Sequence, residues 1–169
     1  MKLTRIFLMA ATILALVSGC SAKKKEITTL QRKEAANLVS EAQFALTLRD
    51  YARAEGLLAK AAELCPDTGE YWMNLGSARM RLGQRDAAKK AYQSGLAAYE
   101  QEAAQNKADP QPALQQVTAL ALLGRVDDAR ALLEKIPSQF PDNRTIRAAV
   151  DNKMLDRMLA DPKFKEVAF

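Results

Sequence analysis

The fold is decided by the stretch YWMNLGSARMRLGQRDAAKKAY, residues 71–92, in which a Leu-Gly turn separates two helical patterns. Ala88 in this stretch has an equivalent small residue 34 positions earlier, Ala54, and another 41 positions later, Ala129. A spacing of 34 residues is the period of a repeated pair of helices. The sequence therefore predicts stacked helical hairpins, one of which is longer than the period.

The Leu-Gly pairs at 82–83 and 123–124 occupy equivalent places in two successive hairpins. Gly can close a helix in the left-handed conformation. The acidic residues Asp86 and Asp127 that follow favour the first turn of the next helix, where the helix dipole is positive. Each unit is therefore predicted to be a helix, a tight turn and a second helix.

These residues resemble the tetratricopeptide repeat (TPR) family, whose 34-residue unit has an early Trp, a Leu-Gly pair, a small residue opening its second helix, a bulky residue four later and a closing Pro. The middle copy supplies Trp72, Leu75, Gly76, Gly83, Ala88 and Tyr92. The first copy keeps Ala54, Leu58, Ala61 and Pro66, with Leu38 at the Trp position and Arg49 at the turn Gly; the third keeps Leu120, Gly124, Ala129, Leu133 and Pro141. The resemblance implies an all-α, right-handed α-solenoid of about three TPR hairpins with a C-terminal capping helix.

Four segments are expected along the chain: a signal peptide over 1–20, a tether over 21–28, the TPR array over 29–142, and a capping helix with a tail over 143–169. The expected helices are Thr28–Leu48, Ala52–Leu64, Tyr71–Leu82, Asp86–Gln105, Ala113–Leu123, Val126–Ile136, one helix Asn143–Ala160 and a short final turn at Pro162. In the first of these, Thr28 and Gln31 have the spacing of a capping box.

The 41-residue step contains seven residues more than the period, which is about two helical turns. Residues 95–107 hold no helix breaker, so we expect the second helix of the middle copy to be extended. The alternative is a kinked linker at 106–112, where Pro110 and Pro112 forbid a helix interior.

The N-terminus has the pattern of an export signal, with Lys2 and Arg5 before an apolar run over 6–17. The tetrad Val-Ser-Gly-Cys at 17–20 resembles a bacterial lipobox, which implies cleavage before Cys20 and lipidation of its thiol. Ser21 resembles the residue of lipoproteins sorted to the outer membrane. The alternative is an ordinary secretory peptide with an incidental Cys.

Composition and motifs argue against catalysis and nucleic-acid binding. The chain is 49% hydrophobic and 27% charged, and its formal net charge of +5 is spread among interspersed opposite charges rather than gathered in a basic patch. It contains no His, no phosphate-cradling Gly-rich loop and no metal-ligand spacing. We therefore expect no enzyme, no cofactor and no metal. Cys65 is expected to be a small apolar residue between repeats, with an intermolecular disulfide as the alternative.

The resemblance implies that the first helices of successive repeats line a concave groove that binds a peptide of a protein partner. The residues expected to face this groove are Val39, Gln43, Leu46, Glu70, Met73, Asn74, Ser77, Met80, Arg81, Gln111, Leu114, Gln115, Thr118 and Ala121. In the alternative, these residues contact the N-terminal segment or the C-terminal cap of their own chain. Only Asn74 matches the basic carboxylate clamp of chaperone-binding TPR proteins, so recognition of a terminal carboxylate is not expected.

Together these features predict a TPR lipoprotein of the cell envelope, on the periplasmic face of the outer membrane, that binds a protein partner and is held by the lipid on Cys20. It resembles the TPR lipoproteins that assist outer-membrane assemblies, such as secretin pilotins or the TPR lipoprotein of the β-barrel assembly machinery. The alternative is a structural envelope protein that associates with further copies of itself.

Overall fold

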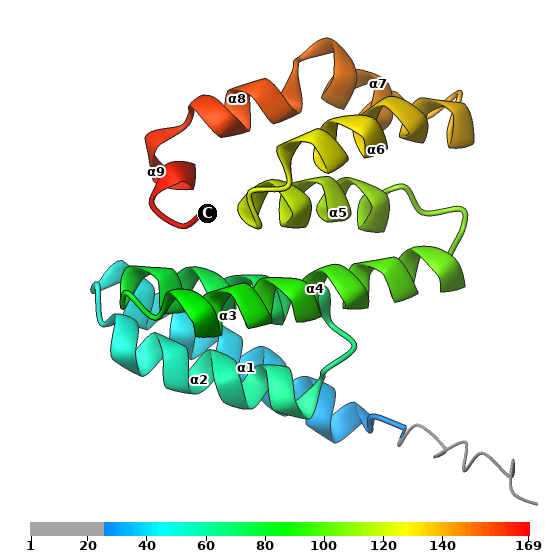
Figure 1. Cartoon of the computed structure of the whole chain (residues 1–169). Coiled ribbons are helices and arrows are strands. Elements are labelled where there is room, and N and C mark those ends of the chain that lie inside the picture. The colour runs from blue at the N-terminus through cyan, green and yellow to red at the C-terminus, as the bar shows by residue number, and fades with distance from the viewer. Residues whose placement is uncertain (1–25) are drawn as a thin grey trace, which may run out of the picture.

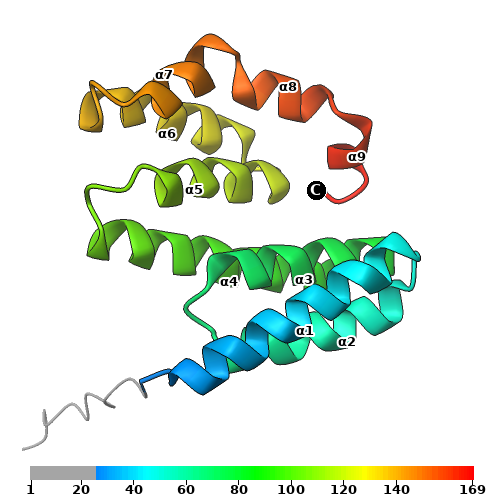
Figure 2. The same ribbon diagram turned by 180° about the vertical axis from the view of Figure 1, so that it is seen from behind.

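The structure is a computed structural model that describes residues 26–169, and every regular element in that range is a helix (Figure 1). The helices are α1 (Thr29–Thr47), α2 (Tyr51–Leu64), α3 (Gly69–Arg81), α4 (Arg85–Gln105), α5 (Gln111–Leu122), α6 (Val126–Gln139), α7 (Arg144–Asp151), α8 (Met154–Ala160) and α9 (Pro162–Lys165). Each packs mainly against its neighbours in the chain, so successive hairpins stack on one another, as the view from behind also shows (Figure 2). The all-α repeat fold is confirmed, whereas the expected signal peptide and Cys20 lie outside the described residues.

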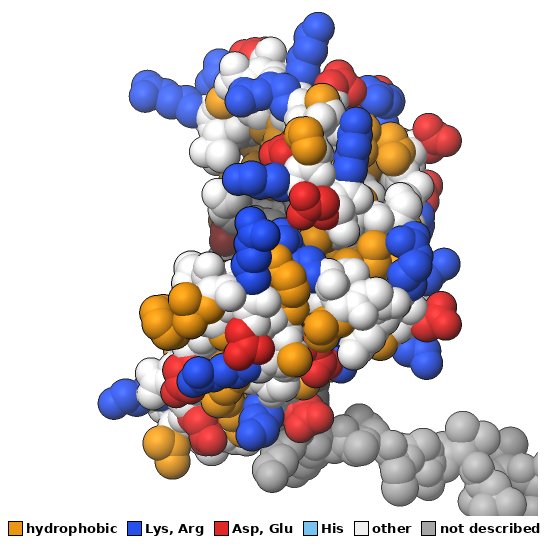
Figure 3. All heavy atoms as spheres, turned by 90° about the vertical axis from the view of Figure 1, so that its left-hand side faces the viewer, with side chains coloured by type: hydrophobic (Ala, Val, Ile, Leu, Met, Phe, Trp, Pro, Cys, Tyr) orange, Lys and Arg blue, Asp and Glu red, His pale blue; other side chains and the backbone are white. Residues whose placement is uncertain are grey.

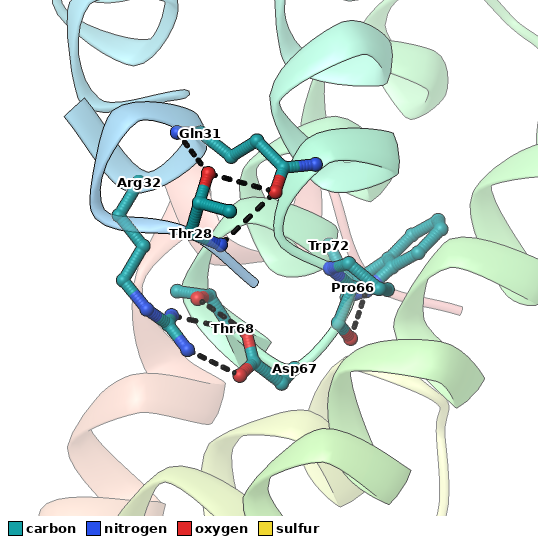
Figure 4. Close-up of polar contacts among 7 residues, drawn as sticks. All are labelled: Thr28, Gln31, Arg32, Pro66, Asp67, Thr68 and Trp72. Atoms are coloured by element: carbon teal, nitrogen blue, oxygen red, sulfur yellow. Dashed lines mark hydrogen bonds and ion pairs between the residues drawn. The ribbon is translucent and has the colours of Figure 1, made fainter. Parts of the chain in front are cut away.

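The start of α1 is fixed by two local interactions and one long-range ion pair (Figure 4). The Thr28 hydroxyl accepts the Gln31 N–H at 3.2 Å, and the Gln31 side chain accepts the Thr28 N–H at 3.0 Å, which is the capping box that the sequence predicts. Arg32 forms an ion pair of 2.7 Å with Asp67, in the loop before α3. This contact joins the N-terminal ends of the first two hairpins.

Left-handed residues close the first helix of all three hairpins. Gly83 and Gly124 have φ values of 74° and 73°, as expected from their Leu-Gly pairs. Arg49, which takes the place of Gly in the first hairpin, also has a positive φ of 59°. The geometry of the turn is therefore kept where the Gly is absent, at the cost of about 1 kcal/mol or more that a side chain incurs in this conformation.

The predicted extension of the middle hairpin is confirmed, because α4 is a single helix of 21 residues. It ends at Gln105, and five residues separate it from α5. Pro112 lies in the first turn of α5, where a missing N–H costs nothing. The connection at 106–110 is thus a short link between an extended helix and the next repeat.

The prediction of one helix over Asn143–Ala160 is wrong. The chain forms α7 and α8, separated by Lys153 in the left-handed conformation with a φ of 49°. The reason lies in the burial of Ile146 and Leu155, whose side chains are 0% and 2% exposed. Nine residues apart, they would lie on opposite sides of a straight helix, so the break lets both reach the core. The expected final turn is present as α9, capped by the Asp161 side chain.

Two apolar clusters meet at α3 and α4. The lower cluster joins α1 and α2 to one face of α3, and the upper cluster joins α3 and α4 to everything that follows. Tyr92 is the largest fully buried side chain, and its ring lies directly against Gly76 of α3, where any Cβ would clash with it. A second Gly–Tyr contact, between Gly69 and Tyr99, repeats this arrangement at the other end of α3.

We predict that Gly76→Ala destabilises the protein by about 1–3 kcal/mol, because the added methyl group overlaps the buried Tyr92 ring. Gly56→Ala, in the interior of α2 with open space around it, should instead stabilise by about 0.5–1 kcal/mol. Urea denaturation followed by circular dichroism measures both. Equal effects of the two substitutions would contradict the packing of Tyr92 on α3.

Candidate binding groove

The concave surface between α3 and α5, floored by α4, is the candidate site; we call it the inter-repeat groove. Its open half is a cavity of about 370 Å³ lined by Thr68, Glu70, Met73, Asn74, Tyr99, Glu102 and Gln115. Its filled half, at the opposite end of α3, is occupied by the chain's own tail, residues 164–169. The two halves differ in what they leave available to a partner.

The open half offers polar groups that the fold leaves unused. Within residues 26–169, the side chains of Glu70, Asn74 and Gln115 make no hydrogen bond or ion pair. Met73 forms an apolar floor beneath them and is 8% exposed. The cavity therefore combines a carboxylate and two amides with an apolar base, which suits the contacts of a peptide with mixed side chains.

Glu102 has a structural part in this cavity. The Gly69 N–H, at the start of α3, donates a hydrogen bond to its carboxylate, and Thr68 makes no side-chain cap there. Glu102 thus satisfies an N–H that the helix itself leaves unpaired. Burial outweighs this hydrogen bond and raises the pKa of Glu102 above its ordinary value. Burial also raises the pKa of the neighbouring Tyr99, so its hydroxyl stays neutral.

The filled half holds the tail through main-chain and side-chain contacts. The Tyr92 hydroxyl donates to the Val167 carbonyl oxygen at 2.7 Å, and the Phe169 N–H donates to the Leu122 carbonyl oxygen at 3.0 Å. Arg81, at the end of α3, lies 3.5 Å from the Glu166 carboxylate. Burial raises the pKa of Tyr92 to about 12, which keeps its hydroxyl a neutral donor at physiological pH.

Basic side chains surround the tail. The Arg85 guanidinium carbon lies 4.8 Å from the centre of the Phe169 ring, and the Lys89 ammonium lies 5.7 Å from it. Figure 3 looks at the side of the molecule on which α9 and the tail lie, and Lys and Arg side chains gather in the band between its lower and upper halves. The filled half is therefore a basic site around the Glu166 carboxylate and the Phe169 ring.

The structure brings only some of the predicted groove residues together. Glu70, Met73, Asn74 and Gln115 share the open half. Ser77 and Arg81 belong to the filled half, where Ser77 contacts the Tyr92 hydroxyl at 3.3 Å, and Met80 is buried in the upper cluster.

The predicted residues of α5 and α1 lie outside the open half, apart from Gln115. On α5, Gln111 is exposed, the Thr118 hydroxyl donates a hydrogen bond within its own helix, and Ala121 is buried. Leu114 lines a separate hollow of about 570 Å³ formed with α7 and α8. Val39 and Leu46 pack in the lower cluster, and the exposed Gln43 lies beside them on α1. Partner contact by each of these residues stays a prediction.

Sequence reasoning missed the contribution of α4, and it included that of the tail only as the alternative in which groove residues contact the C-terminal cap of their own chain. Tyr99 and Glu102 reach the open half from the last turns of α4, whereas the repeat pattern assigns the groove to first helices alone. The two extra turns implied by the 41-residue step were the signal for them. For the tail, the signal was its apolar residues, Phe164 and Val167, after a predicted turn.

Cys65 is a buried, unpaired thiol in the lower cluster, as expected for a packing residue between repeats. Burial raises its pKa, which keeps the thiol protonated. Among residues 26–169, no helix has both the length and the hydrophobicity needed to cross a bilayer.

Stacked antiparallel hairpins with a groove along their first helices define a helical repeat protein. Residues 69–102 and residues 111–143 each match tetratricopeptide repeat families, and these are the second and third hairpins of the structure. The chain therefore carries two tetratricopeptide repeats. No curated protein matches it. Repeats of this kind are scaffolds for protein–protein interaction, which makes the inter-repeat groove a candidate surface for a protein partner.

We predict that Glu102→Gln alters the pH dependence of stability. Because the pKa of Glu102 is raised by folding, ionising it costs folding free energy, and the free energy of unfolding of the natural chain falls as pH rises from about 4.5 through the folded pKa. Gln can still accept the Gly69 N–H but carries no charge. Its stability relative to the natural chain should therefore increase with pH between about 4 and 7.

Urea denaturation at several pH values measures this trend. Glu100→Gln, two residues away on the exposed side of α4, is the matched control. A difference between Glu102→Gln and the natural chain that does not vary with pH would contradict the burial of the Glu102 carboxylate.

Proposed function

We propose that this chain is a lipid-anchored adaptor of the cell envelope that holds a protein partner in the open half of the inter-repeat groove. The observation that carries the proposal is the unused polar set of Glu70, Asn74 and Gln115 over the Met73 floor. Polar side chains left without partners in a concave, partly apolar site suit contacts supplied by another molecule. The tetratricopeptide repeats support the same conclusion.

Membrane anchoring is supported by the sequence before the repeats. Cys20 follows a basic and then an apolar segment, ending in Val17-Ser18-Gly19. Acyl chains contribute about 0.8 kcal/mol for each buried CH₂, so more than one chain would hold the protein firmly on a bilayer. An outer-membrane location, indicated by Ser21, is part of the proposal, as is a role in assembling outer-membrane complexes.

We predict that Glu70→Lys combined with Gln115→Ala lowers partner capture about tenfold or more, because the pair removes an amide and reverses the charge in the open half. The measurement is affinity capture from detergent-solubilised membranes of the source cell, with the recovered proteins quantified by mass spectrometry. Both residues are exposed, so folding should be kept.

Glu100→Lys with Gln93→Ala is the matched control, since these residues lie two turns apart on the exposed side of α4. The same charge reversal outside the groove should leave capture unchanged. A partner retained equally by both double variants would refute binding in the open half.

We predict that Cys20→Ser moves the protein from the membrane fraction to the soluble fraction of the cell envelope, because serine cannot accept the thioether-linked lipid. Cell fractionation followed by immunoblotting measures this. Cys65→Ala alters the other cysteine of the chain and should leave the protein in the membrane fraction. Retention of the Cys20→Ser protein on membranes would contradict lipid anchoring.

A second candidate function, self-association, is favoured by the outer face of α1. Leu30, Phe44 and Leu48 are 74%, 61% and 62% exposed there, on the side where a preceding repeat would stack. Light scattering separates the two functions. A dimer of the natural chain that Phe44→Ser with Leu48→Ser converts to a monomer would support self-association, and a monomer at micromolar concentration would refute it.

A further inference from the structure

The tail has the contacts of a bound peptide rather than those of a packed helix. Beyond the four-residue α9, main-chain groups of the tail make two hydrogen bonds with the groove. The Val167 carbonyl oxygen accepts one from the Tyr92 hydroxyl, and the Phe169 N–H donates the other to the Leu122 carbonyl oxygen. Such bonds do not depend on the side chains of the segment that makes them. Another segment that forms the same short turn could therefore replace the tail in this respect.

Side-chain contacts then set which segments fit. Glu166 faces Arg81, Val167 is buried with 9% exposure, and the Phe169 ring lies under two cations and 6.4 Å from the Tyr92 ring in an edge-on arrangement. The residue between them, Ala168, is small. The filled half is thus complementary to an acidic, an aliphatic, a small and an aromatic residue in that order.

Val167 of the tail belongs to the upper cluster, whereas the other contacts that hold the tail are partly exposed. Its ion pair is partly exposed, with 32% of the Arg81 side chain and 59% of the Glu166 side chain accessible, and Phe169 is 36% exposed. Among the helices, α9 packs appreciably only against α8. Segments with few buried contacts open locally at low free-energy cost.

We propose that the filled half of the inter-repeat groove is a second docking site for the partner, specific for a segment with an acid–aliphatic–small–aromatic pattern, and that residues 166–169 occupy it in the unbound protein as a competing ligand. This inference rests on the proposed partner binding and adds to it a subsite and a ligand chemistry. A partner with this pattern displaces the tail and extends from the filled half along α3 into the open half.

The test uses a fluorescent peptide with the sequence of residues 163–169, KFKEVAF, and the full chain purified in detergent. Glu166→Ala with Phe169→Ala in the chain removes the ion pair and the ring that hold the tail. If the tail occupies the site at least about nine-tenths of the time, fluorescence anisotropy should show the peptide binding this variant about tenfold or more tightly than the natural chain. Lys163→Ala with Lys165→Ala, also in the tail, is the matched control and should bind as the natural chain does.

The charge requirement is tested by exchanging the partners of the ion pair. A peptide with Lys at the position of Glu166 should bind the tail-released chain several-fold more weakly, and Arg81→Glu in that chain should restore its binding. Equal, weak binding of the peptide to the natural and tail-released chains, with helicity unchanged, would overturn the proposal. Dimerisation of the natural chain that the peptide blocks would also overturn it, because the occupant would then be the tail of a second copy.

A second measurement applies if the double substitution unfolds the chain. Saturating peptide should accelerate hydrogen exchange of the Phe169 amide in the natural chain, because its hydrogen bond to the Leu122 carbonyl oxygen is lost; unchanged exchange would overturn the inference. Failure here is distinguishable from failure of the proposed function. The peptide experiment involves no cellular partner, and the capture experiment with Glu70→Lys and Gln115→Ala involves no change in the tail.

Discussion

The contact between Gly76 and Tyr92 is the constraint on which most of the upper half of the molecule depends. Because α3 has no side chain at Gly76, the Tyr92 ring lies against its backbone and is fully buried. That position presents the Tyr92 hydroxyl to Ser77 on one side and to the Val167 carbonyl on the other. One small residue thus sets both how closely α3 and α4 pack and where the end of the chain is held.

The Tyr92 contact also explains why the groove has two unlike halves. At the C-terminal end of α3, Tyr92 and Arg81 offer a donor and a cation, and the tail supplies the matching groups. At the N-terminal end, Tyr99 lies against Gly69 in the same way, but no segment within residues 26–169 follows to fill the space above it. The same Gly–Tyr packing, repeated two turns apart along α4, leaves one half occupied and the other open.

Much of the fold could be predicted from local sequence signals. The Leu-Gly turns, the capping box at Thr28 and the length of α4 each follow from residues close together in the chain. The break at Lys153 could not be predicted in this way, because Ile146, Val150, Met154 and Met158 have ideal helical spacing. Only the tertiary position of Leu155, which must reach the same core as Ile146, overrides that local pattern.

The site was less predictable than the fold, for a related reason. A repeat pattern identifies which helix faces the groove, and it identified Glu70, Met73 and Asn74. It carries no information about residues that reach the groove from outside the pattern. Glu102 comes from turns of α4 that the standard repeat lacks, and Val167 comes from a segment that is 75 residues from its partner Tyr92 in sequence. Such long-range contacts depend on the assembled fold.

The ion pair between Arg32 and Asp67 has a consequence for how the protein would be oriented at a bilayer. It places the beginning of α1 beside the loop that leads into α3, and Figure 1 shows the described chain starting on the side opposite the tail. Under the proposed anchoring, the six peptide units from Cys20 to Glu26 span at most about 20 Å. The open half of the groove would then lie toward the lipid surface and the tail away from it, so a partner's membrane-proximal part would be the one that meets Glu70 and Asn74.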